Sequence, residues 1–324
     1  MKIAILDDYM DMVRGLRAYA KLDGHQVSSI NEHIRDAAEL ARRIGDAEAL
    51  VMIRERTPIT SALLDHLPDL KVVIQNGAYP HIDVEACTRH GVAVSVSTTS
   101  RPSYATAELT WGLIIASMRQ IPQQMARLKA GGWQSVAGMG LRARTLGVYG
   151  YGKIGNLVAG YGRAFGMKVL VWSRETALAN ARADGFNAAP SKQALFEDSD
   201  VVTVHLRLVP ETRNIVTGED LARMKPTSVF VNTSRAGLVE PGALEAALRE
   251  GRPGAAAVDV FEDEPLTDGN HPLLKMDNVI ATPHLGYVER DAIEHYFGIA
   301  FDQLVNFLRG NMTNVVNADE LARR

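Results

Sequence analysis

The sequence predicts an α/β protein built from two doubly wound parallel sheets. Short apolar runs rich in Val and Ile alternate with helix-like segments along the chain, and most of these runs are continuous. Continuous runs are typical of parallel strands that helices cover on both faces. The chain also has 324 residues, which is too many for one ordinary hydrophobic core and suits two domains.

Eleven apolar runs are the candidate strands, and the segments between them complete βαβ units. Two helices have recognisable ends. One has Pro241 near its start and Gly251 just past its end, and a long amphipathic candidate closes with Gly310. The candidate strands are residues 2–6, 26–30, 49–53, 71–75 and 92–96, then 145–150, 168–172, 200–206, 228–233, 255–260 and 278–283.

Composition narrows the class of protein. A hydrophobic fraction of 46% and a charged fraction of 23% are those of an ordinary soluble globular protein. The net charge of −3 without a basic block argues against nucleic acid as a partner. The one cysteine, Cys87, excludes metal sites made of clustered cysteines and fits a reducing compartment. No apolar stretch is long enough to span a bilayer, and the N-terminus does not resemble a secretory signal. We therefore expect a cytoplasmic protein with no metal site and no membrane partner.

A glycine motif follows the strand predicted at 145–150. The stretch "GVYGYGKIG" provides Gly150, Gly152 and Gly155, with Lys153 and Ile154 between them, and a helix-like segment follows. In this context the first glycine allows a tight turn, the second lets the backbone approach a pyrophosphate, and the third lets the helix pack against the strand. The free N–H groups of the helix N-terminus then face the phosphates. The stretch predicts a dinucleotide-binding unit.

The next strand ends in an unusual residue for such a unit. An Asp or Glu about 20 residues after the first motif glycine normally accepts a hydrogen bond from a ribose hydroxyl of NAD. Ser173 occupies that place, 23 residues after Gly150, and Arg174 follows it. Ser173 does not repel a 2′-phosphate, and Arg174 can form a charge-assisted bond with one, worth roughly 1.5–3 kcal/mol. We predict NADP(H) as the preferred cofactor. NAD(H) is the alternative, in which Glu175 takes the ribose.

Four stretches in this order resemble the D-isomer specific 2-hydroxyacid dehydrogenase family: "GYGKIG", "VNTSRAGLVE", "VDVFEDEPL" and "TPHLGY". That family includes glyoxylate/hydroxypyruvate reductases, D-lactate dehydrogenases and phosphoglycerate dehydrogenase. The resemblance implies a flavodoxin-like substrate domain and a Rossmann cofactor domain. Because the glycine motif starts only near residue 147, a first α/β unit precedes the cofactor unit. We expect the last helix, after Gly286, to pack back on that unit. This gives a discontinuous substrate domain, residues 1–100 and 287–324, around a dinucleotide-binding domain, residues 101–286.

The resemblance implies three catalytic residues, Arg235, Glu264 and His284. The chemistry suits them. A guanidinium can grip the carboxylate of a 2-oxo acid with two parallel hydrogen bonds and polarise the adjacent carbonyl. Imidazole can give the carbonyl oxygen its proton, since its unperturbed pKa lies near neutrality. Glu264 would hold the ring and favour its charged form. Taken singly, each residue has an ordinary structural reading as a surface or loop side chain.

The first unit resembles the substrate domain of the family. The stretch "QNGAYPHID" stands where the family has a loop whose backbone amides bind the substrate carboxylate, with Gly77 and Ala78 at the amide positions and Asn76 beside them. The usual Asp-Asn pair is replaced by Pro80-His81, which leaves the loop shape and the substrate open. Arg54 and Arg56 in "IRERTPIT" alternate on a strand end and could share one side, as arginines that hold a substrate phosphate in phosphoglycerate-type members do. Solvated charges are the alternative.

Further cofactor contacts are implied by the resemblance alone. Thr106 matches a position near the nicotinamide, and Asp259 matches one that accepts a hydrogen bond from its amide. The remaining matches are His205, Pro210 and Thr212 in the loop on the adenosine side, and Thr233 before the catalytic Arg. His205 also has a purely structural reading.

The functional expectation is an NADP(H)-dependent reductase of a small 2-oxo acid, of the glyoxylate/hydroxypyruvate type. An NAD-dependent phosphoglycerate-type or other D-2-hydroxyacid dehydrogenase is the enzymatic alternative. A cofactor-sensing corepressor is the alternative from another class, since some family members serve in that way. The resemblance also implies a homodimer, paired around the helix that spans Thr106 to Arg119.

Overall fold

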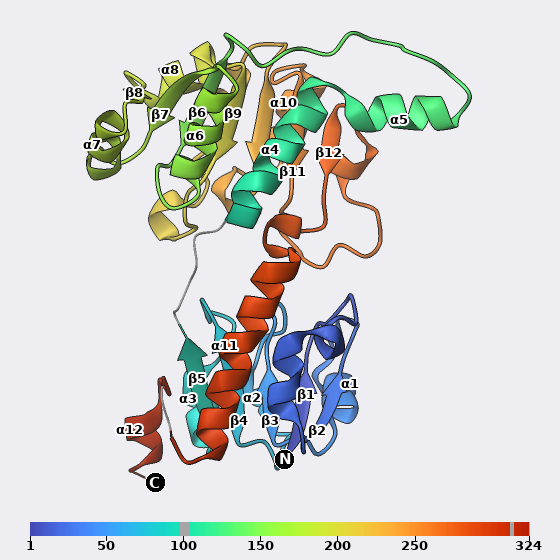
Figure 1. Cartoon of the computed structure of the whole chain (residues 1–324), viewed down its shortest axis with the longest axis vertical. Coiled ribbons are helices and arrows are strands. Elements are labelled where there is room, and N and C mark those ends of the chain that lie inside the picture. The colour runs from blue at the N-terminus through green and yellow to red at the C-terminus, as the bar shows by residue number, and fades with distance from the viewer. Residues whose placement is uncertain (98–103, 312–313, 324) are drawn as a thin grey trace. The chain divides into compact units, whose positions relative to one another are not determined.

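The computed structural model describes residues 1–97, 104–311 and 314–323, and these form two compact units. Unit 1 comprises residues 1–101 and 290–324, and unit 2 comprises residues 102–289. Both are α/β units with a parallel sheet between layers of helices (Figure 1). The predicted fold class is therefore confirmed.

Unit 1 contains a five-stranded sheet with the strand order β2-β1-β3-β4-β5, and all of its neighbouring strands are parallel. This is the flavodoxin-like order. The strands are β1 (Lys2–Ile5), β2 (Gln26–Ser29), β3 (Ala49–Val51), β4 (Val72–Asn76) and β5 (Ala93–Ser97); the helical segments are η1 (Val13–Gly15), η2 (Arg17–Leu22), α1 (Ala37–Ile44), α2 (Ser61–Leu64), α3 (Val84–Arg89), α11 (Arg290–Leu308) and α12 (Ala318–Leu321).

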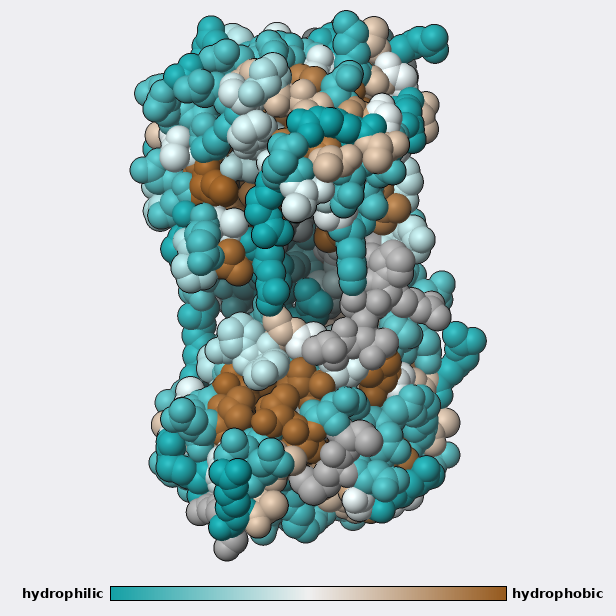
Figure 2. Space-filling model, turned by 90° about the vertical axis from the view of Figure 1, so that its left-hand side faces the viewer, coloured by the Kyte–Doolittle hydropathy of each residue, from teal (hydrophilic) through white to brown (hydrophobic). Residues whose placement is uncertain are grey.

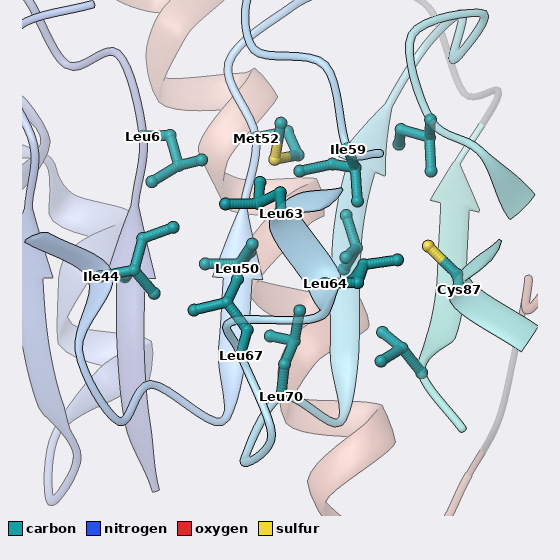
Figure 3. Close-up of a cluster of buried hydrophobic side chains, with 14 of the residues drawn as sticks. Leu6, Ile44, Leu50, Met52, Ile59, Leu63, Leu64, Leu67, Leu70 and Cys87 are labelled. Atoms are coloured by element: carbon teal, nitrogen blue, oxygen red, sulfur yellow. The ribbon is translucent and has the colours of Figure 1, made fainter. Parts of the chain in front are cut away.

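The core on one face of this sheet is aliphatic. Leu50 and Met52 from the strand β3 region pack with Leu63 and Leu64 of α2, and all four are at most 2% exposed (Figure 3). Because side chains alternate across a strand, the neighbouring strand residues face the other side of the sheet, where α11 runs. The thiol of Cys87 lies in the same cluster, and burial raises its pKa to about 12.

The end of the chain completes unit 1. Helix α11 packs on β4, β5 and η2, and the carboxylate of Glu294 accepts hydrogen bonds from the backbone N–H groups of Arg17 and Ala18 at 2.9 and 2.7 Å. The segment 314–317 then pairs antiparallel with the outer edge of β5. Asn317 fixes this segment: it is 1% exposed and bonds Val94 N, Val92 O and Thr88 Oγ1.

Unit 2 contains a seven-stranded parallel sheet with the order β12-β11-β10-β9-β6-β7-β8. The strands are β6 (Thr145–Tyr149), β7 (Lys168–Trp172), β8 (Asn187–Ala188), β9 (Val201–Val204), β10 (Val229–Asn232), β11 (Ala255–Val258) and β12 (Val279–Ala281). The strand order reverses between β6 and β9, and in open α/β sheets ligands bind at the carboxyl ends of the strands at such a point.

Helices cover both faces of this sheet (Figure 1). Residues of α4, α6 and α7 pack on one face, and residues of α8, α9 and α10 pack on the other. Their bounds are α4 (Tyr104–Met118), α5 (Ile121–Lys129), α6 (Gly155–Ala164), α7 (Glu175–Ala183), α8 (Lys192–Asp198), α9 (Gly218–Ala222) and α10 (Ala243–Arg249), with 3-10 turns η3 (Pro210–Thr212), η4 (Ala236–Leu238), η5 (Pro272–Lys275) and η6 (Leu285–Tyr287).

Helix α5 differs from the other long helices because it has no buried residue. It stands away from the sheet in Figure 1, and an extended segment leads back to β6. Large apolar side chains are exposed along α5 and this segment. They are Ile121, Met125, Leu128, Trp133 and Val136, each 40–72% exposed.

The rest of the surface is mostly hydrophilic in the view of Figure 2, although hydrophobic patches interrupt it. Among the described residues, no helix combines the length and the apolar character that crossing a bilayer requires.

The units divide close to the expected boundaries. The first expected boundary, near residue 100, falls in 98–103, outside the described residues. The second division follows Glu289 rather than Gly286, because η6 belongs to unit 2. Gly286 N–H donates to Asp259 at 2.8 Å, and Thr106 Oγ1 donates to Gly286 O at 2.6 Å, so these bonds tie η6 to the sheet and to α4.

Candidate active site

The glycine loop lies at the point where the strand order of unit 2 reverses. Gly150 follows β6 with φ = 100°, a conformation that favours glycine, and its N–H donates to Trp172 O at 2.8 Å. A Cβ at Gly150 would lie 2.4 Å from His205 O, and one at Gly155 would lie 2.0 Å from Gly150 O. Both glycines are therefore required by close backbone packing.

Gly152 is different because no atom lies within 4 Å of the place where its Cβ would stand. The open space is at the beginning of α6, where free N–H groups end the helix and Ile154 is the N-cap residue. Lys153 is exposed beside it. A loop with a packing glycine on each side and an open one between fits a pyrophosphate against the helix N-terminus.

The end of β7 carries Ser173 and Arg174. Arg174 is the N-cap residue of α7, so both residues adjoin the free N–H groups that begin this helix. Glu175 is the first residue of α7, and its carboxylate accepts a hydrogen bond from Arg182 Nη1 at 2.6 Å. An open pocket of about 740 Å³ lies along α7 and β8, and Ser173 is among its lining residues.

Arg235 follows β10 in a tight polar turn. Asn232 Oδ1 accepts from Ser234 N–H at 3.0 Å, and Asn232 Nδ2 donates to Arg235 O at 2.9 Å. Ser234 Oγ donates to Val204 O at 2.8 Å, which ties the turn to the neighbouring strand β9. These bonds fix the backbone from which the guanidinium projects. Arg235 is half-buried, and its Nη1 donates to Ser234 O at 2.8 Å.

His284 and Glu264 are in contact. His284 Nδ1 lies 2.6 Å from Glu264 Oε2, and both side chains are about 15% exposed. The other carboxylate oxygen accepts from Phe261 N–H at 2.9 Å, which fixes the carboxylate. Because an ionised carboxylate can only accept, Nδ1 carries the hydrogen of this bond, and Nε2 takes no part in it. His284 has a left-handed backbone, φ = 53°, as the N-cap residue of η6.

Asp259 anchors the loop that carries His284. This carboxylate is completely buried, and it accepts hydrogen bonds from Thr282 Oγ1 at 2.6 Å, Leu285 N–H at 2.7 Å and Gly286 N–H at 2.8 Å. Burial raises the pKa of Asp259, and these donors oppose the rise. The predicted contact with a nicotinamide amide would therefore have to share a carboxylate that already has three donors.

Thr106 and Thr233 are linked through a third threonine. Thr110 Oγ1 lies 2.8 Å from Thr233 Oγ1 and donates to Thr106 O at 2.7 Å, while Thr106 Oγ1 donates to Gly286 O. Thr110 and Thr233 are both buried. The chain of bonds joins α4 to the end of β10 and to η6, so both predicted threonines help to hold the loops that carry Arg235 and His284. Sequence reasoning missed Thr110, whose only signal is its position one helical turn after Thr106.

The loop predicted on the adenosine side is held by its own bonds. Thr212 Oγ1 donates to Arg207 O at 2.6 Å and accepts from Val209 N–H at 2.9 Å, and Pro210 begins η3. His205 Nε2 lies 2.9 Å from Thr203 Oγ1, and desolvation lowers the pKa of His205 to about 3. These geometries support structural roles for the His205 and Thr212 side chains.

A second residue that sequence reasoning missed steadies the glycine loop. Tyr151 Oη donates to Asp184 Oδ2 at 2.7 Å, and its ring packs edge-on against Phe186 with centroids 5.9 Å apart. The tyrosine stands between two motif glycines, where the motif itself accepts any residue. No spacing rule could therefore have found it.

The candidate substrate residues lie in unit 1, and two expectations need correction. Gly77 N–H donates to Ser97 O at 2.8 Å as a continuation of the sheet, so this amide is already used and only Ala78 is left as a predicted amide donor. Arg54 and Arg56 do not alternate on a strand, because β3 ends at Val51 and Arg54 adopts a left-handed backbone with φ = 57°.

Asn76 is the third candidate in this loop. It is buried, and its Nδ2 donates to Tyr296 O at 3.4 Å. Its side chain thus serves the packing of β4 against α11. No group of three or more His, Cys, Asp or Glu side chains within the described residues is placed to hold a metal ion.

Comparison with known proteins agrees with this geometry. Residues 111–286 match the family model for the NAD-binding domain of D-isomer specific 2-hydroxyacid dehydrogenases. A D-3-phosphoglycerate dehydrogenase of Methanocaldococcus jannaschii is 40% identical over 86% of this chain, and the match spans 53% of that relative, about half its length. A glyoxylate reductase of Aeropyrum pernix is 37% identical over 86% of each chain.

A solved structure from Ralstonia solanacearum, provisionally described as a D-3-phosphoglycerate dehydrogenase oxidoreductase, is 54% identical, with a TM-score of 0.94 over 99% of this chain and 98% of its own. The sequence matches extend over most of both units, and the structural match extends over nearly all of the chain. The chain therefore belongs to the D-isomer specific 2-hydroxyacid dehydrogenase family.

Proposed function

We propose that this protein is an NADP(H)-preferring reductase of a small 2-oxo acid, of the glyoxylate/hydroxypyruvate type. The observation that carries the proposal is the 2.6 Å contact between His284 Nδ1 and Glu264 Oε2. His284 follows β12 at the carboxyl end of the parallel sheet whose strand β6 leads into a glycine motif suited to a dinucleotide. A histidine fixed by a carboxylate is arranged to give a proton to an oxygen or to take one from it.

Each residue has one step in the proposed reaction. A bound nicotinamide supplies the hydride. Arg235 holds the carboxylate of the oxo acid and draws electron density toward the carbonyl oxygen. As the hydride adds to the carbonyl carbon, His284 Nε2 gives its proton to that oxygen, and Glu264 stabilises the charged ring before the transfer. In the oxidation direction, His284 is the base that removes the hydroxyl proton.

The preference for NADP(H) rests on the end of β7. Ser173 brings no negative charge, and Arg174 adds a positive one at the first turn of α7, where the helix dipole also favours an anion. The alternative requires Glu175 to accept from a ribose hydroxyl, but its carboxylate is paired with Arg182. A 2′-phosphate is thus favoured by three features, whereas NAD(H) would depend on the exposed Glu175 carboxylate, one oxygen of which already accepts from Arg182.

The roles of the units and the partners are also proposals. We assign the substrate to unit 1, through the Ala78 amide and through Arg54 and Arg56, and the cofactor to unit 2. We propose a homodimer formed through α4 and α5, because α5 exposes a row of apolar side chains. We also propose a cytoplasmic location, which is supported by a single cysteine that is a buried free thiol.

A second candidate is an NAD-dependent phosphoglycerate-type dehydrogenase. Arg54 and Arg56 favour it, because two guanidinium groups in one turn can bind a phosphate on the far end of a substrate. The similarity of the chain to proteins named D-3-phosphoglycerate dehydrogenase also supports this candidate.

Initial rates of the purified protein test the proposal. NADPH and NADH are compared in parallel over glyoxylate, hydroxypyruvate, pyruvate, phenylpyruvate and phosphohydroxypyruvate. We expect NADPH oxidation with glyoxylate or hydroxypyruvate. A preference for phosphohydroxypyruvate with NADH would replace the proposal by the second candidate. Tight cofactor binding without turnover of any acid would favour a cofactor-sensing protein.

Replacing Arg174 tests the cofactor assignment separately. In Arg174→Ala we expect the Kd for NADPH to rise about ten- to a hundredfold, because a charge-assisted bond is lost, while the Kd for NADH stays the same. Titration of the cofactor fluorescence measures both constants. An unchanged NADPH constant together with a preference for NADH would reject the assignment.

A further inference from the structure

We infer that Gln75 and Tyr296 are positioning residues, which hold the turn at residues 54–56 and the loop at residues 77–79 in one fixed register. Both segments belong to unit 1 and carry its predicted substrate residues. The inference rests on the proposed function, because that function makes these segments a binding site for the oxo acid. It names two residues whose side chains bond to the backbone of Met52, Arg54 and Ala78 and would act through that backbone.

Arg54 has the conformation that needs explanation. Its φ of 57° lies in the left-handed region, which a long side chain rarely adopts, so surrounding bonds must stabilise it. Tyr296 supplies one of them: Arg54 N–H donates to Tyr296 Oη at 3.2 Å, and the same hydroxyl donates to Met52 O at 3.1 Å. One hydroxyl therefore bridges the end of the β3 region and the turn beyond it.

Gln75 supplies the other side of the clamp. Its side chain is completely buried, and Nε2 donates to Ala78 O at 2.7 Å and points to Arg54 O at 3.4 Å. Both partners are carbonyl oxygens, which only accept, so the amide nitrogen must face them. Arg54 is thus held on its N–H side by Tyr296 and on its C=O side by Gln75, and Gln75 also holds the loop of Ala78.

The oxygen of the Gln75 side-chain amide shows that packing alone does not explain why a glutamine occupies this position. Within the described residues, Gln75 Oε1 is buried and has no hydrogen-bond partner. A buried polar atom without a partner costs free energy, and an apolar side chain of the same size would avoid that cost. A methionine or leucine could fill the same space but could not donate hydrogen bonds to the carbonyl oxygens of Arg54 and Ala78.

The clamp has a rigid base, because its two members stand on elements that are bonded to each other. Gln303 Nε2 donates to Gln75 O at 3.3 Å, Ser95 Oγ donates to Gln303 Oε1 at 2.9 Å, and Asn76 Nδ2 donates to Tyr296 O. Strands β4 and β5 and helix α11 are joined in this way beneath the two segments. Gln75 and Tyr296 therefore stand on neighbouring elements that are bonded to each other, while it is their own side chains that reach the two segments.

Two variants test the clamp, and each keeps the shape of its residue. Gln75→Met removes the bridge between Ala78 O and Arg54 O, and Tyr296→Phe removes the hydroxyl between Met52 O and Arg54 N–H. Ser95→Ala is the matched control: it removes a buried hydrogen bond of the same network that reaches neither segment. The readouts are kcat, the KM for the oxo acid, the KM for NADPH and the Tm.

We expect the KM for the oxo acid to rise about three- to tenfold in both variants, which corresponds to one neutral hydrogen bond. Neither kcat nor the KM for NADPH should change by more than about twofold, because the proton donor and the cofactor residues belong to unit 2. In the control we expect the Tm to fall and all kinetic constants to stay the same. A KM that is unchanged in both variants, or that rises equally in the control, overturns the inference.

Hydrogen exchange separates a failure of this inference from a failure of the proposed function. If the wild-type protein turns over none of the acids, the proposed function fails, and amide exchange of residues 52–56 and 77–79, followed by mass spectrometry, still decides the clamp. Faster exchange in both segments in Gln75→Met and Tyr296→Phe, but not in Ser95→Ala, supports it. Unchanged exchange in these segments overturns it.

Discussion

His284 is the residue on which the proposed chemistry depends most directly. In His284→Gln we expect kcat to fall about 10²- to 10⁴-fold, because general acid catalysis is lost, while the Kd for NADPH stays the same. Steady-state rates and cofactor titration measure the two effects. If kcat fell less than about tenfold, the proton would have to come from another group.

His205 makes the stability of unit 2 depend on pH. Burial lowers the pKa of His205 to about 3, whereas the unfolded chain keeps an ordinary value near 6.5. Between these values the unfolded state binds a proton that the folded state does not, so stability is complete above about pH 6.5 and is lost as the pH falls. At pH 5 this linkage amounts to roughly 2 kcal/mol.

The variant His205→Gln should lose less stability on acidification than the wild-type protein. Urea unfolding at pH 7.5 and at pH 5 measures the difference, and comparison of the two proteins removes the contribution of all other groups. Equal losses in both proteins would mean that His205 is protonated in the folded state.

Sequence reasoning predicted one contact correctly, while the catalytic roles of its two residues stay predictions. Glu264 and His284 meet as the motifs predict, because each motif fixes a residue at the end of a strand or in the loop that follows it. It failed at Gly77, whose amide is taken by Ser97, and at Arg54, whose backbone leaves the strand. Both failures concern backbone bonding beyond a strand end, which no side-chain pattern records.

In the glycine loop, one added methyl group should have different effects at two positions. It should lower stability at Gly155 and NADPH affinity at Gly152. Gly155→Ala would set a Cβ 2.0 Å from Gly150 O, so we expect a loss of about 1–3 kcal/mol in stability and a lower Tm. Gly152→Ala meets no atom within 4 Å, so the Tm should stay the same while NADPH affinity falls about tenfold or more.

Differential scanning calorimetry and cofactor titration together test this pair. The two variants are controls for each other, since each adds one methyl group to the same loop. If Gly152→Ala bound NADPH as tightly as the wild-type protein, the pyrophosphate could not lie against this loop.

The strands could be predicted from the sequence wherever apolar residues form a continuous run. Each of the eleven candidate runs overlaps a strand, because buried parallel strands need apolar side chains on both faces. Strand β8 was missed: it has two residues, Asn187 and Ala188, at the edge of the sheet and carries no hydrophobic signal. The pairing of residues 314–317 with β5 was missed for the same reason, since backbone bonds and one Asn side chain define it.

Helix α5 leads to a prediction about the whole molecule. A helix without a buried residue gains little from packing in its own chain, and burial in a second copy would stabilise it. We expect Met125→Asp and Leu128→Asp each to raise the dimer dissociation constant at least about tenfold, with little change in Tm.

Light scattering after size-exclusion chromatography measures this effect over a range of concentrations. Met10→Asp in unit 1 is the matched control, since Met10 and Met125 have similar exposure, 50% and 53%. A dimer that survives both α5 substitutions, or one that Met10→Asp disrupts equally, would exclude α5 as its interface.

The discontinuous build of unit 1 has a consequence for synthesis on the ribosome. Residues 102–289 are contiguous, so unit 2 can fold while the cover of the first sheet, α11 and the segment 314–317, has not yet been made. At roughly 5–20 residues per second, the interval lasts on the order of 10–40 s. During this interval the apolar face of β4 is uncovered, and the unpaired backbone groups at the open edge of β5 can pair with other nascent chains. Chaperone demand in the cell should therefore arise from residues 1–101, although they are synthesised before unit 2.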